Sequence, residues 1–236
     1  MMNILVTGAS KGIGKEIAQK LKSCGKVYVS ARNEEALKCL DCNGYCVCDL
    51  SKPEDLIRLG NFIEEHKIDI LINNAGEYIY SRVDENKIED LEHIISVNLK
   101  APIYLTGRAV PYMKNNKWGR IVNIGSISGV MGEACASMYS ATKSGLIGFS
   151  KATGLELAEY GITVNTINPG WVDTELGKGS IEDSEFSQDE IIECIPQRRF
   201  VSPSEVAGLV KYLISEDAKG ITGQSINLCA GLSVGI

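Results

Sequence analysis

Short apolar runs alternate with amphipathic stretches of helical length along almost the whole chain. Seven runs are rich in Val and Ile and show no regular polar alternation, which is typical of strands covered on both faces. These predicted strands are residues 3–6, 26–30, 45–48, 69–72, 120–124, 163–167 and 225–228. The intervals carry helical periodicity at residues 13–23, 53–65, 88–114, 138–160 and 203–216.

Repeated strand–helix alternation predicts an α/β fold with a parallel sheet, helices on both faces and right-handed crossovers. No internal repeat, charge block or linker divides the sequence. We therefore expect residues 1–236 to form a single doubly wound domain of the Rossmann type with a seven-stranded sheet. In such a sheet, ligands bind at the carboxyl ends of the strands, near the point where the strand order reverses.

The composition excludes several classes of protein. The chain has 236 residues, 44% of them hydrophobic, and a net charge of −6. This length can bury a substantial core, and the acidic balance argues against nucleic-acid or anionic-membrane partners. No apolar run reaches the roughly 18–20 residues of a membrane span. The first residues run directly into a predicted strand, so we expect no signal peptide and a cytoplasmic protein.

Four of the eight cysteines form the run C-x2-C-x3-C-x-C at Cys39, Cys42, Cys46 and Cys48. Zinc sites with four thiolates usually come as two well-separated pairs, whereas Cys46 and Cys48 fall in a predicted strand. We therefore favour free cysteines that fill small apolar sites, with no metal and no disulfide. The alternative left open is that modification of this cluster disturbs ligand binding nearby.

A glycine-rich turn follows the first predicted strand and opens a helix. Glycine lets the backbone approach a diphosphate, and a helix N-terminus offers free N–H donors with a partial positive charge. Its place in an alternating fold makes it a candidate dinucleotide site. The spacing is G-x3-G-x-G rather than G-x-G-x-x-G. The predicted contacts in this turn are Gly8, Ser10, Lys11, Gly12, Ile13 and Gly14.

The end of the second strand bears on which dinucleotide is used. An acidic side chain there would bind the ribose hydroxyls of NAD and repel a 2′-phosphate, but this chain has Ala31 followed by Arg32. Arg32 and Lys11 could converge on one phosphate, which favours NADP over NAD. The alternative is that both cations are solvated surface charges.

Ser126, Tyr139 and Lys143 are the candidate catalytic residues. Tyr139 and Lys143 are four apart on a predicted helix, so both side chains lie on one face. Carbonyl reduction needs an acid that protonates the forming alkoxide, and an adjacent ammonium lowers the pKa of a tyrosine toward that task. A serine hydroxyl can hold the carbonyl oxygen. Only two histidines are present, both in charged helical contexts, so histidine-based hydrolysis has little support.

These motifs together resemble the short-chain dehydrogenases/reductases over nearly the whole chain. The resemblance rests on the glycine spacing, Asn-Asn-Ala-Gly at 73–76, thirteen positions from Ser126 to Tyr139, Tyr-x3-Lys, and Asn-Pro-Gly at 168–170. It implies that Tyr139 is the general acid/base and that Ser126 positions the substrate oxygen. It also implies that Lys143 tunes Tyr139 and holds the nicotinamide ribose, while Asn98 organises a proton-relay water.

The resemblance assigns the remaining cofactor contacts to three places. Asp49 and Leu50 would lie at the adenine, and the turn after the fourth strand would lie beside the adenosine ribose. The segment after the sixth strand would lie against the nicotinamide. The residues in the last two places are Asn74, Ala75, Gly76, Pro169, Gly170 and Val172.

Residues 173–200 carry two glycines and many acids, and we expect them to form a lid over the substrate. Segments 144–151, 195–200 and 221–224 look most like bacterial 3-oxoacyl-[acyl-carrier-protein] reductases. The resemblance therefore implies an NADPH-dependent oxidoreductase, with a 3-oxoacyl thioester as the leading substrate. Against it stand a short segment 32–45 and Leu-Cys-Ala-Gly at 228–231 in place of the family's Asp-Gly-Gly.

Several alternatives stay open at this point. The substrate could be a sugar, steroid-like or secondary-metabolite ketone, or the protein could be a non-catalytic NADP-binding sensor. The resemblance also implies a homotetramer formed through the helices at 88–114 and 138–160. An acyl carrier protein is a candidate partner, and a basic patch of Lys114, Lys117 and Arg120 could attract it. The alternative is that these three residues are solvated charges and form no such patch.

Overall fold

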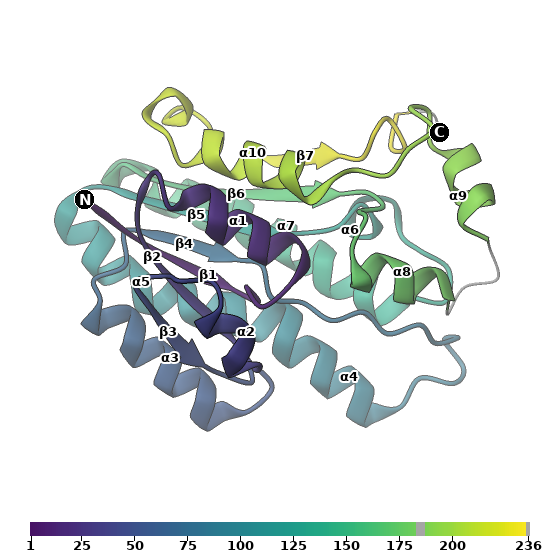
Figure 1. Ribbon diagram of the computed structural model, residues 1–236, viewed down its shortest axis with the longest axis horizontal. Coiled ribbons are helices and arrows are strands. Elements are labelled where there is room, and N and C mark those ends of the chain that lie inside the picture. The colour runs from purple at the N-terminus through teal and green to yellow at the C-terminus, as the bar shows by residue number, and fades with distance from the viewer. Residues whose placement is uncertain (183–186, 235–236) are drawn as a thin grey trace.

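A computed structural model describes residues 1–182 and 187–234, and these form a seven-stranded parallel sheet (Figure 1). Its strand order is β3-β2-β1-β4-β5-β6-β7. Each predicted strand is found within two residues of its expected ends, which confirms the predicted fold class. The strands are β1 (Met2–Thr7), β2 (Gly25–Ala31), β3 (Gly44–Val47), β4 (Ile70–Asn73), β5 (Gly119–Ile124), β6 (Ile162–Pro169) and β7 (Ser225–Leu228).

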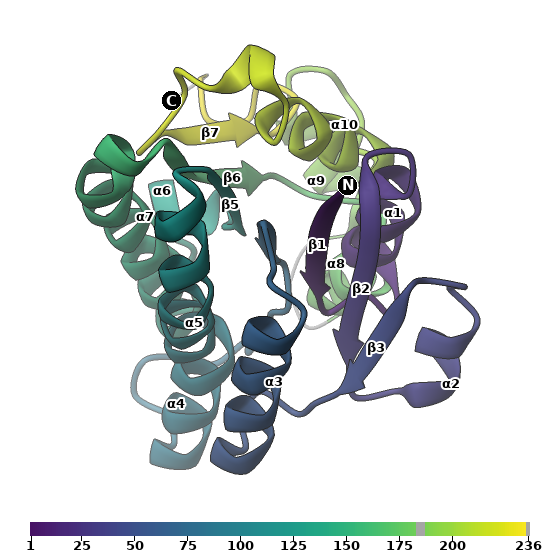
Figure 2. The same ribbon diagram turned by 90° about the vertical axis from the view of Figure 1, so that its left-hand side faces the viewer.

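Helices cover both faces of the sheet, as predicted (Figure 2). One face carries α1 (Gly12–Leu21) and α10 (Pro203–Leu213), and the other carries α3 (Pro53–Glu65), α5 (Ala101–Asn116) and α7 (Ser137–Leu157). Alternate side chains of β1 enter the two cores, as the two-residue period of a strand requires. The other helices are α2 (Glu34–Lys38), α4 (Ile88–Ile95), α6 (Ser128–Met131), α8 (Glu175–Glu182) and α9 (Gln188–Cys194).

The helical interval predicted at 88–114 differs from a single helix. A π-helical turn at Ser96–Lys100 separates α4 from α5, and it carries Asn98. Such turns are rare and occur frequently at functional sites. A pattern of apolar spacing cannot distinguish it from ordinary α-helix, because the apolar stripe continues through it.

The basic patch considered at Lys114, Lys117 and Arg120 is not formed, because Arg120 is only 2% exposed. Its guanidinium donates to the carbonyl oxygens of Gly119 and Gly161 at 2.9 and 3.1 Å. It also pairs with Glu216 at 3.2 Å. Arg120 is therefore neither part of a patch nor a solvated charge: it fastens the start of β5 to the neighbouring loops.

The cysteine cluster divides between the core and the surface. Cys46 and Cys48 are buried under α3, whereas Cys39 is exposed, and the described cysteines are free thiols. Burial raises the pKa of Cys46 and, to about 12, the pKa of Cys48, so these thiols are poorly nucleophilic. Within residues 1–182 and 187–234, no group of three or more His, Cys, Asp or Glu is placed to hold a metal ion. Over the same ranges, no helix is long and apolar enough to cross a membrane.

The strand order reverses between β1 and β4, which are neighbours although far apart in sequence. The chain builds outward from β1 through β2 and β3, and then from β4 through β7 in the other direction. The loops at the carboxyl ends of β1 and β4 consequently diverge and leave a crevice, which is where ligands bind in open parallel sheets.

Candidate active site

A cavity of about 1120 Å³ lies along the carboxyl edge of the sheet. Every residue predicted to contact the cofactor lies on its wall, from the glycine turn to Val172, and so does Ser126. Asn98 is the predicted site residue that lies behind the wall, fully buried. The structure thus brings nearly all of the sequence-predicted residues around one space, although they come from the carboxyl ends of six strands and from α7.

The glycine turn, Lys11 and Arg32 line one end of the cavity, which we call the phosphate end. Gly8 has a φ of +66°, and a Cβ there would lie 2.7 Å from the Cα of Ala75. A Cβ on Gly14 would lie 2.3 Å from the carbonyl oxygen of Gly8. Lys11, at the N-cap of α1, makes no side-chain cap. Uncapped N–H groups at a helix start that borders the cavity fit a diphosphate.

Each cation of the phosphate end holds a separate carboxylate. Lys11 Nζ lies 2.8 Å from Glu175 on α8, and Arg32 Nη1 lies 2.8 Å from Glu77. The structure therefore places both cations on the cavity wall but does not aim them at one point, as the sequence interpretation expected. Both pairs are largely exposed on the cation side, so each is a weak contact that a phosphate could replace.

The turn after β4 is fastened to the glycine turn across the point where the strand order reverses. Asn74 Nδ2 donates to the carbonyl oxygens of Thr7 and Gly8 at 2.9 and 3.2 Å. The Thr7 hydroxyl accepts from the backbone N–H groups of Asn74 and Ala75. These bonds hold the predicted ribose and diphosphate contacts in one rigid unit.

Asp49 and Leu50 follow β3 and lie on the cavity wall beside Arg32, at the predicted adenine position. The Asp49 carboxylate accepts hydrogen bonds from the backbone N–H and hydroxyl of Ser51, at 3.1 and 2.7 Å through the same oxygen. Its second oxygen has capacity for another donor.

The opposite end of the cavity, which we call the catalytic end, holds Ser126, Tyr139 and Lys143. Ser126 follows β5, while Tyr139 and Lys143 lie on successive turns of α7. Lys143 is 3% exposed, and its Nζ donates to the carbonyl oxygen of Ile124 at 3.0 Å. Burial lowers the pKa of Lys143 to about 8. The ammonium lies 5.6 Å from the centre of the Tyr139 ring, on the face expected from the four-residue spacing.

Tyr139 is held as a protonated phenol. Burial raises its pKa to about 12; a hydrogen bond with Ser126 opposes that rise, and the negative charge of Glu133 adds to it. Tyr78 packs its ring edge-on against Tyr139 with 5.1 Å between ring centres. The rise in pKa runs against the sequence expectation that Lys143 lowers the pKa of Tyr139, because the cost of burying a tyrosinate outweighs the effect of the ammonium here.

Asn98 acts on the backbone in this structure. Its Nδ2 donates to the carbonyl oxygen of Glu77 and its Oδ1 accepts from the N–H of Glu77, both at 2.8 Å. Nδ2 also lies 3.3 Å from the Thr142 hydroxyl on α7. Asn98 therefore fixes the chain after the Asn-Asn-Ala-Gly turn against the helix that carries Tyr139 and Lys143.

The segment after β6 closes the catalytic end. The Ile127 N–H donates to the carbonyl oxygen of Pro169 at 2.9 Å, and the Gly170 N–H donates to that of Leu228 at 3.0 Å. A Cβ on Gly170 would lie 2.9 Å from the Cα of Cys229, so only glycine fits there. Val172 lies on the cavity wall, and its contact with a nicotinamide stays a prediction.

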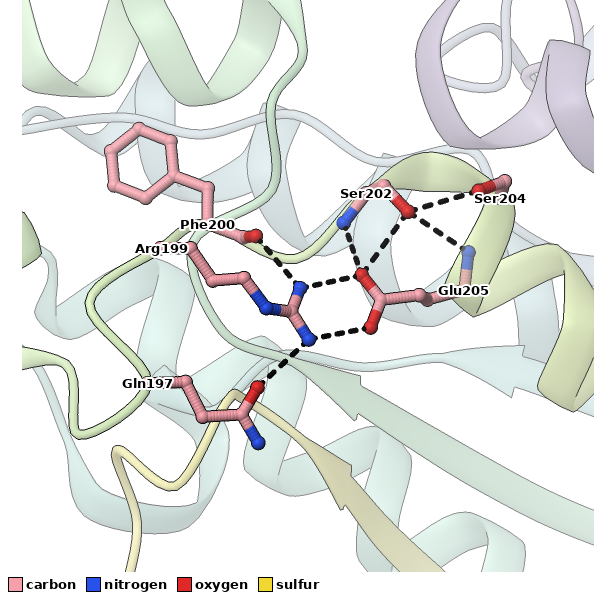
Figure 3. Close-up of polar contacts among 6 residues, drawn as sticks. All are labelled: Gln197, Arg199, Phe200, Ser202, Ser204 and Glu205. Carbon is pink, nitrogen blue, oxygen red and sulfur yellow. Dashed lines mark hydrogen bonds and ion pairs between the residues drawn. The ribbon is translucent and has the colours of Figure 1, made fainter.

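The predicted lid begins directly after this segment. Its first residues line the cavity and include Glu175 and Leu176 on α8, while α9 lies further out (Figure 1). Residues 183–186 of the predicted lid lie outside the described residues. The far end is anchored by Arg199, which pairs with both carboxylate oxygens of Glu205 at 2.8 and 2.9 Å (Figure 3). Glu205 also accepts from the N–H and hydroxyl of Ser202, closing a capping box at the start of α10.

Four polar residues stand out among those of the cavity wall that the sequence interpretation did not single out: Glu77, Tyr78, Ser128 and Glu133. Two of them carried a visible signal. Glu77 places a charge directly after Asn-Asn-Ala-Gly, and Glu133 is the one charged residue between Ser126 and Tyr139. A carboxylate in a segment that must enter an active site is costly to desolvate, so it is expected to have partners there.

The fold and the site geometry define a class of proteins: oxidoreductases with a nucleotide cleft at the edge of a doubly wound sheet and a Ser–Tyr–Lys arrangement. Residues 2–185 match the family described as short chain dehydrogenase. The chain belongs to this family, which confirms the resemblance seen in the sequence, and it is an oxidoreductase.

Relatives and solved structures agree with this assignment. The chain is 37% identical over 234 residues to 3-oxoacyl-[acyl-carrier-protein] reductase FabG of Rickettsia felis, covering 97% of this chain and 95% of the relative. A variant of actinorhodin polyketide ketoreductase with NADPH superposes with a TM-score of 0.92 at 37% identity, covering 99% and 97% of the two chains. YwfH, an NADPH-dependent reductase involved in bacilysin biosynthesis, superposes with a TM-score of 0.93 at 30% identity, covering 100% and 99%.

Proposed function

We propose that this oxidoreductase uses NADPH to reduce a 3-oxoacyl thioester to the 3-hydroxyacyl thioester. One observation carries the proposal: Ser126, Tyr139 and Lys143 meet on the wall of a cavity whose other end is the uncapped start of α1. A carbonyl held at the catalytic end and a dinucleotide held by its diphosphate at the phosphate end would share this single space. The identity to 3-oxoacyl-[acyl-carrier-protein] reductase supports the choice of substrate.

The phosphate end supports NADPH as the cofactor. Ala31 leaves the end of β2 without the acid that would repel a 2′-phosphate, and Arg32 follows on the cavity wall. Arg32 can contact a phosphate through two N–H groups, which is a strong arrangement. Both solved structures named above are described with NADPH.

NADPH supplies the hydride when it is bound, and the chain's own residues manage the oxygen of the carbonyl. Ser126 donates a hydrogen bond that holds this oxygen. Tyr139 gives its phenolic proton to the oxygen as negative charge develops there. The Lys143 ammonium stabilises the resulting tyrosinate. Asn98 keeps the backbone beside Lys143 in place through its two bonds to Glu77.

Apolar side chains on the wall support an acyl chain as part of the substrate. They come from α6, the segment after β6, the lid and the C-terminal segment: Met131, Trp171, Leu176 and Leu232. In this proposal, residues 173–200 form a lid that covers the acyl chain of the bound substrate. Residues 1–236 form a single domain. An acyl carrier protein would deliver the substrate, and the enzyme would act in the cytoplasm.

A second candidate is another ketone, such as a sugar, steroid-like or secondary-metabolite ketone. The polar group Glu133, Tyr78 and Ser128 on the same wall favours a substrate with hydroxyl groups. The likeness to a polyketide ketoreductase and to a reductase of bacilysin biosynthesis points the same way. The catalytic roles of Ser126 and Tyr139 are the same for both candidates.

A homotetramer is also part of the proposal. Exposed apolar side chains remain on α5 and α7, including Ile103 and Leu155. A monomer by light scattering at micromolar concentration would contradict it.

The test is a substrate comparison with product identification. The purified protein receives NADPH with 3-oxoacyl groups on an acyl carrier protein, the same groups on pantetheine, and a panel of sugar, steroid-like and secondary-metabolite ketones. We expect NADPH to be consumed fastest with the thioesters, with the 3-hydroxyacyl product identified by mass spectrometry. No turnover of either thioester, with turnover of another ketone, would replace the proposed substrate by the second candidate.

A further inference from the structure

His93 is a residue close to the cavity that the proposed mechanism does not use. It lies in the last turn of α4, and its side chain is 37% exposed. Its Nε2 lies 2.5 Å from one carboxylate oxygen of Glu77, a residue of the cavity wall. Because an ionised carboxylate can only accept, Nε2 carries the hydrogen and donates it. His93 is therefore a hydrogen-bond donor to an acid of the cofactor cavity.

The Glu77 carboxylate is shared between His93 and Arg32. Its other oxygen lies 2.8 Å from Arg32 Nη1, which belongs to the cation that the proposed function assigns to the 2′-phosphate. Within residues 1–182 and 187–234, Arg32 and His93 are the basic side chains that contact this carboxylate. One carboxylate thus connects the phosphate end of the cavity to α4.

The backbone of Glu77 is fixed on the cavity wall. Asn98 holds both its N–H and its carbonyl oxygen, each at 2.8 Å. The preceding residue is equally constrained, because a Cβ on Gly76 would lie 3.2 Å from Lys143 Nζ. Only rotation of the Glu77 side chain could therefore separate its carboxylate from Arg32.

The π-helical turn helps to bring both of these partners to Glu77. His93 and Asn98 are five residues apart, and on a regular α-helix their side chains would point about 140° apart. A π-helical turn closes on residue i+5 instead of i+4, so the wider turn at Ser96–Lys100 rotates Asn98 back toward the side of His93. One helical segment consequently holds the backbone of Glu77 through Asn98 and its carboxylate through His93.

A 2′-phosphate at Arg32 would change the partners of Glu77. The guanidinium would turn from the carboxylate to the phosphate, which leaves two anionic groups beside one cation. Like charges repel, and a carboxylate that loses one donor is stabilised by keeping another. His93 supplies that donor and keeps the carboxylate from following Arg32. NADH has no 2′-phosphate and leaves the Arg32–Glu77 pair as it is.

We propose that His93 is a positioning residue for cofactor selection. By holding the Glu77 carboxylate, it lets Arg32 leave this carboxylate for a 2′-phosphate, and it thereby favours NADPH over NADH. The inference rests on the proposed use of NADPH and adds to it a residue of α4 that acts through Glu77.

The first test compares the dissociation constants of NADPH and NADH, measured by fluorescence titration at one pH and ionic strength. We expect His93→Leu to bind NADPH about tenfold more weakly, at the low end for a hydrogen bond to a charged group because the pair is partly exposed. NADH should bind as before. His93→Gln keeps a side-chain N–H donor and should retain most of the NADPH affinity. Equal weakening of both nucleotides in His93→Leu, or an unchanged NADPH affinity, would overturn the proposal.

A double-mutant cycle tests whether His93 acts through Glu77. Glu77→Gln removes the carboxylate that competes for Arg32, so the double variant His93→Leu/Glu77→Gln should bind NADPH as tightly as Glu77→Gln alone. A double variant weakened by the same factor as His93→Leu would show that His93 acts elsewhere. The matched control is His66→Leu, which removes the histidine at the end of α3, outside the residues that line the cavity. It should leave both affinities unchanged.

A second measurement separates this inference from the proposed function. Adenosine 2′,5′-bisphosphate and 5′-AMP differ by the 2′-phosphate and carry no nicotinamide, so calorimetry with these two probes reports on the phosphate end alone. We expect His93→Leu to weaken the bisphosphate but not AMP, and Glu77→Gln to cancel this difference. If the unchanged protein reduces no carbonyl with NADPH, the proposed function fails, while this cycle still decides the role of His93. If the protein is an active NADPH reductase but both probes weaken equally in His93→Leu, only the inference fails.

Discussion

At the catalytic end of the cavity, Lys143 is buried and donates a hydrogen bond to the backbone, while Tyr139 is half-buried on the cavity wall. At the phosphate end, Lys11 and Arg32 lie largely in solvent, each paired with an acid from another segment. Burial can shift the pKa of a group strongly, whereas an exposed ion pair contributes only about 0–1 kcal/mol to stability. The titratable groups of the catalytic end are therefore strongly perturbed by burial, whereas the cations of the phosphate end make exposed ion pairs that are easily exchanged.

The two ends also differ in how their residues are connected. The catalytic end is assembled mainly from β5 and α7, which are adjacent in sequence. The acids at the phosphate end come from distant segments, since Glu77 follows β4 and Glu175 begins α8. Substitutions at the catalytic end should consequently change turnover, and those at the phosphate end should change binding.

Of the variants that test this difference, Tyr139→Phe is expected to have the largest effect, a loss of turnover. It removes the proton donor while keeping the ring that packs against Tyr78, so turnover with any ketone substrate should fall by about 10²–10⁴-fold. NADPH affinity, measured by fluorescence titration, should stay unchanged. Tyr212→Phe, an exposed tyrosine on α10, is the matched control. Retained turnover in Tyr139→Phe would remove Tyr139 from the mechanism.

Arg32→Asp should have the next largest effect, and on binding alone. A charge-assisted hydrogen bond contributes about 1.5–3 kcal/mol, so losing it should weaken NADPH about 10–100-fold. NADH lacks the 2′-phosphate and should bind equally well or better. Dissociation constants for both nucleotides measure this directly. Equal weakening of both would show that Arg32 does not contact the 2′-phosphate.

Glu77→Gln should act in the opposite direction and more weakly. It removes the carboxylate that competes for Arg32, so NADPH should bind a few-fold more tightly, as expected from about 0.2–1 kcal/mol for an exposed pair. The gain should shrink at high ionic strength, because salt screens the pair. Glu65→Gln, on the exposed side of α3, should leave the NADPH affinity unchanged. Weaker binding in Glu77→Gln would mean that the glutamate positions Arg32 rather than opposing it.

The smallest effect is expected where the lid segment is anchored. Hydrogen bonds from Arg199 and Ser202 lower the pKa of Glu205 to about 2 from an ordinary value of 4.5. A lowered folded-state pKa gives stability that is present above pH 4.5 and is lost as the pH falls toward 2. Since this pair is partly exposed, it should contribute less than about 1 kcal/mol.

Thermal unfolding of Arg199→Met against the unchanged protein checks this anchor. The variant should melt slightly earlier at pH 7, and the difference should narrow as the pH falls below 4.5. A difference in Tm that is constant from pH 7 to pH 3 would contradict the assigned role of the ion pair.

The sequence predicted the catalytic end more completely than the phosphate end, for a physical reason. The spacing of Tyr139 and Lys143 on one helix places both on one face, and the strand before Ser126 aims it at the same edge. The partners of Lys11 and Arg32 could not be predicted in this way, because Glu175 is 164 residues from Lys11. Pairing between such distant side chains depends on how the loops pack, which local patterns do not encode.

Two other features could not be predicted from the sequence, because they too depend on packing and backbone geometry. Arg120 occupies a strand position that suited an exposed cation, but carbonyl groups from β5 and the loop before β6 offered it buried partners. The π-helical turn at Ser96–Lys100 continues the apolar stripe of α4 and is visible only in the backbone. Glu133, by contrast, stood out as a lone charge between Ser126 and Tyr139 and could have been singled out.

The central claim is that one end of the cavity performs the reduction and the other selects the cofactor. The direct test measures NADPH affinity and saturated turnover on the same preparations of the unchanged protein, Tyr139→Phe and Arg32→Asp. We predict that Tyr139→Phe loses turnover with normal affinity, and that Arg32→Asp loses affinity but keeps its turnover once NADPH is saturating. If Arg32→Asp instead loses saturated turnover, or Tyr139→Phe loses affinity to the same degree, the division of the site into two ends is wrong.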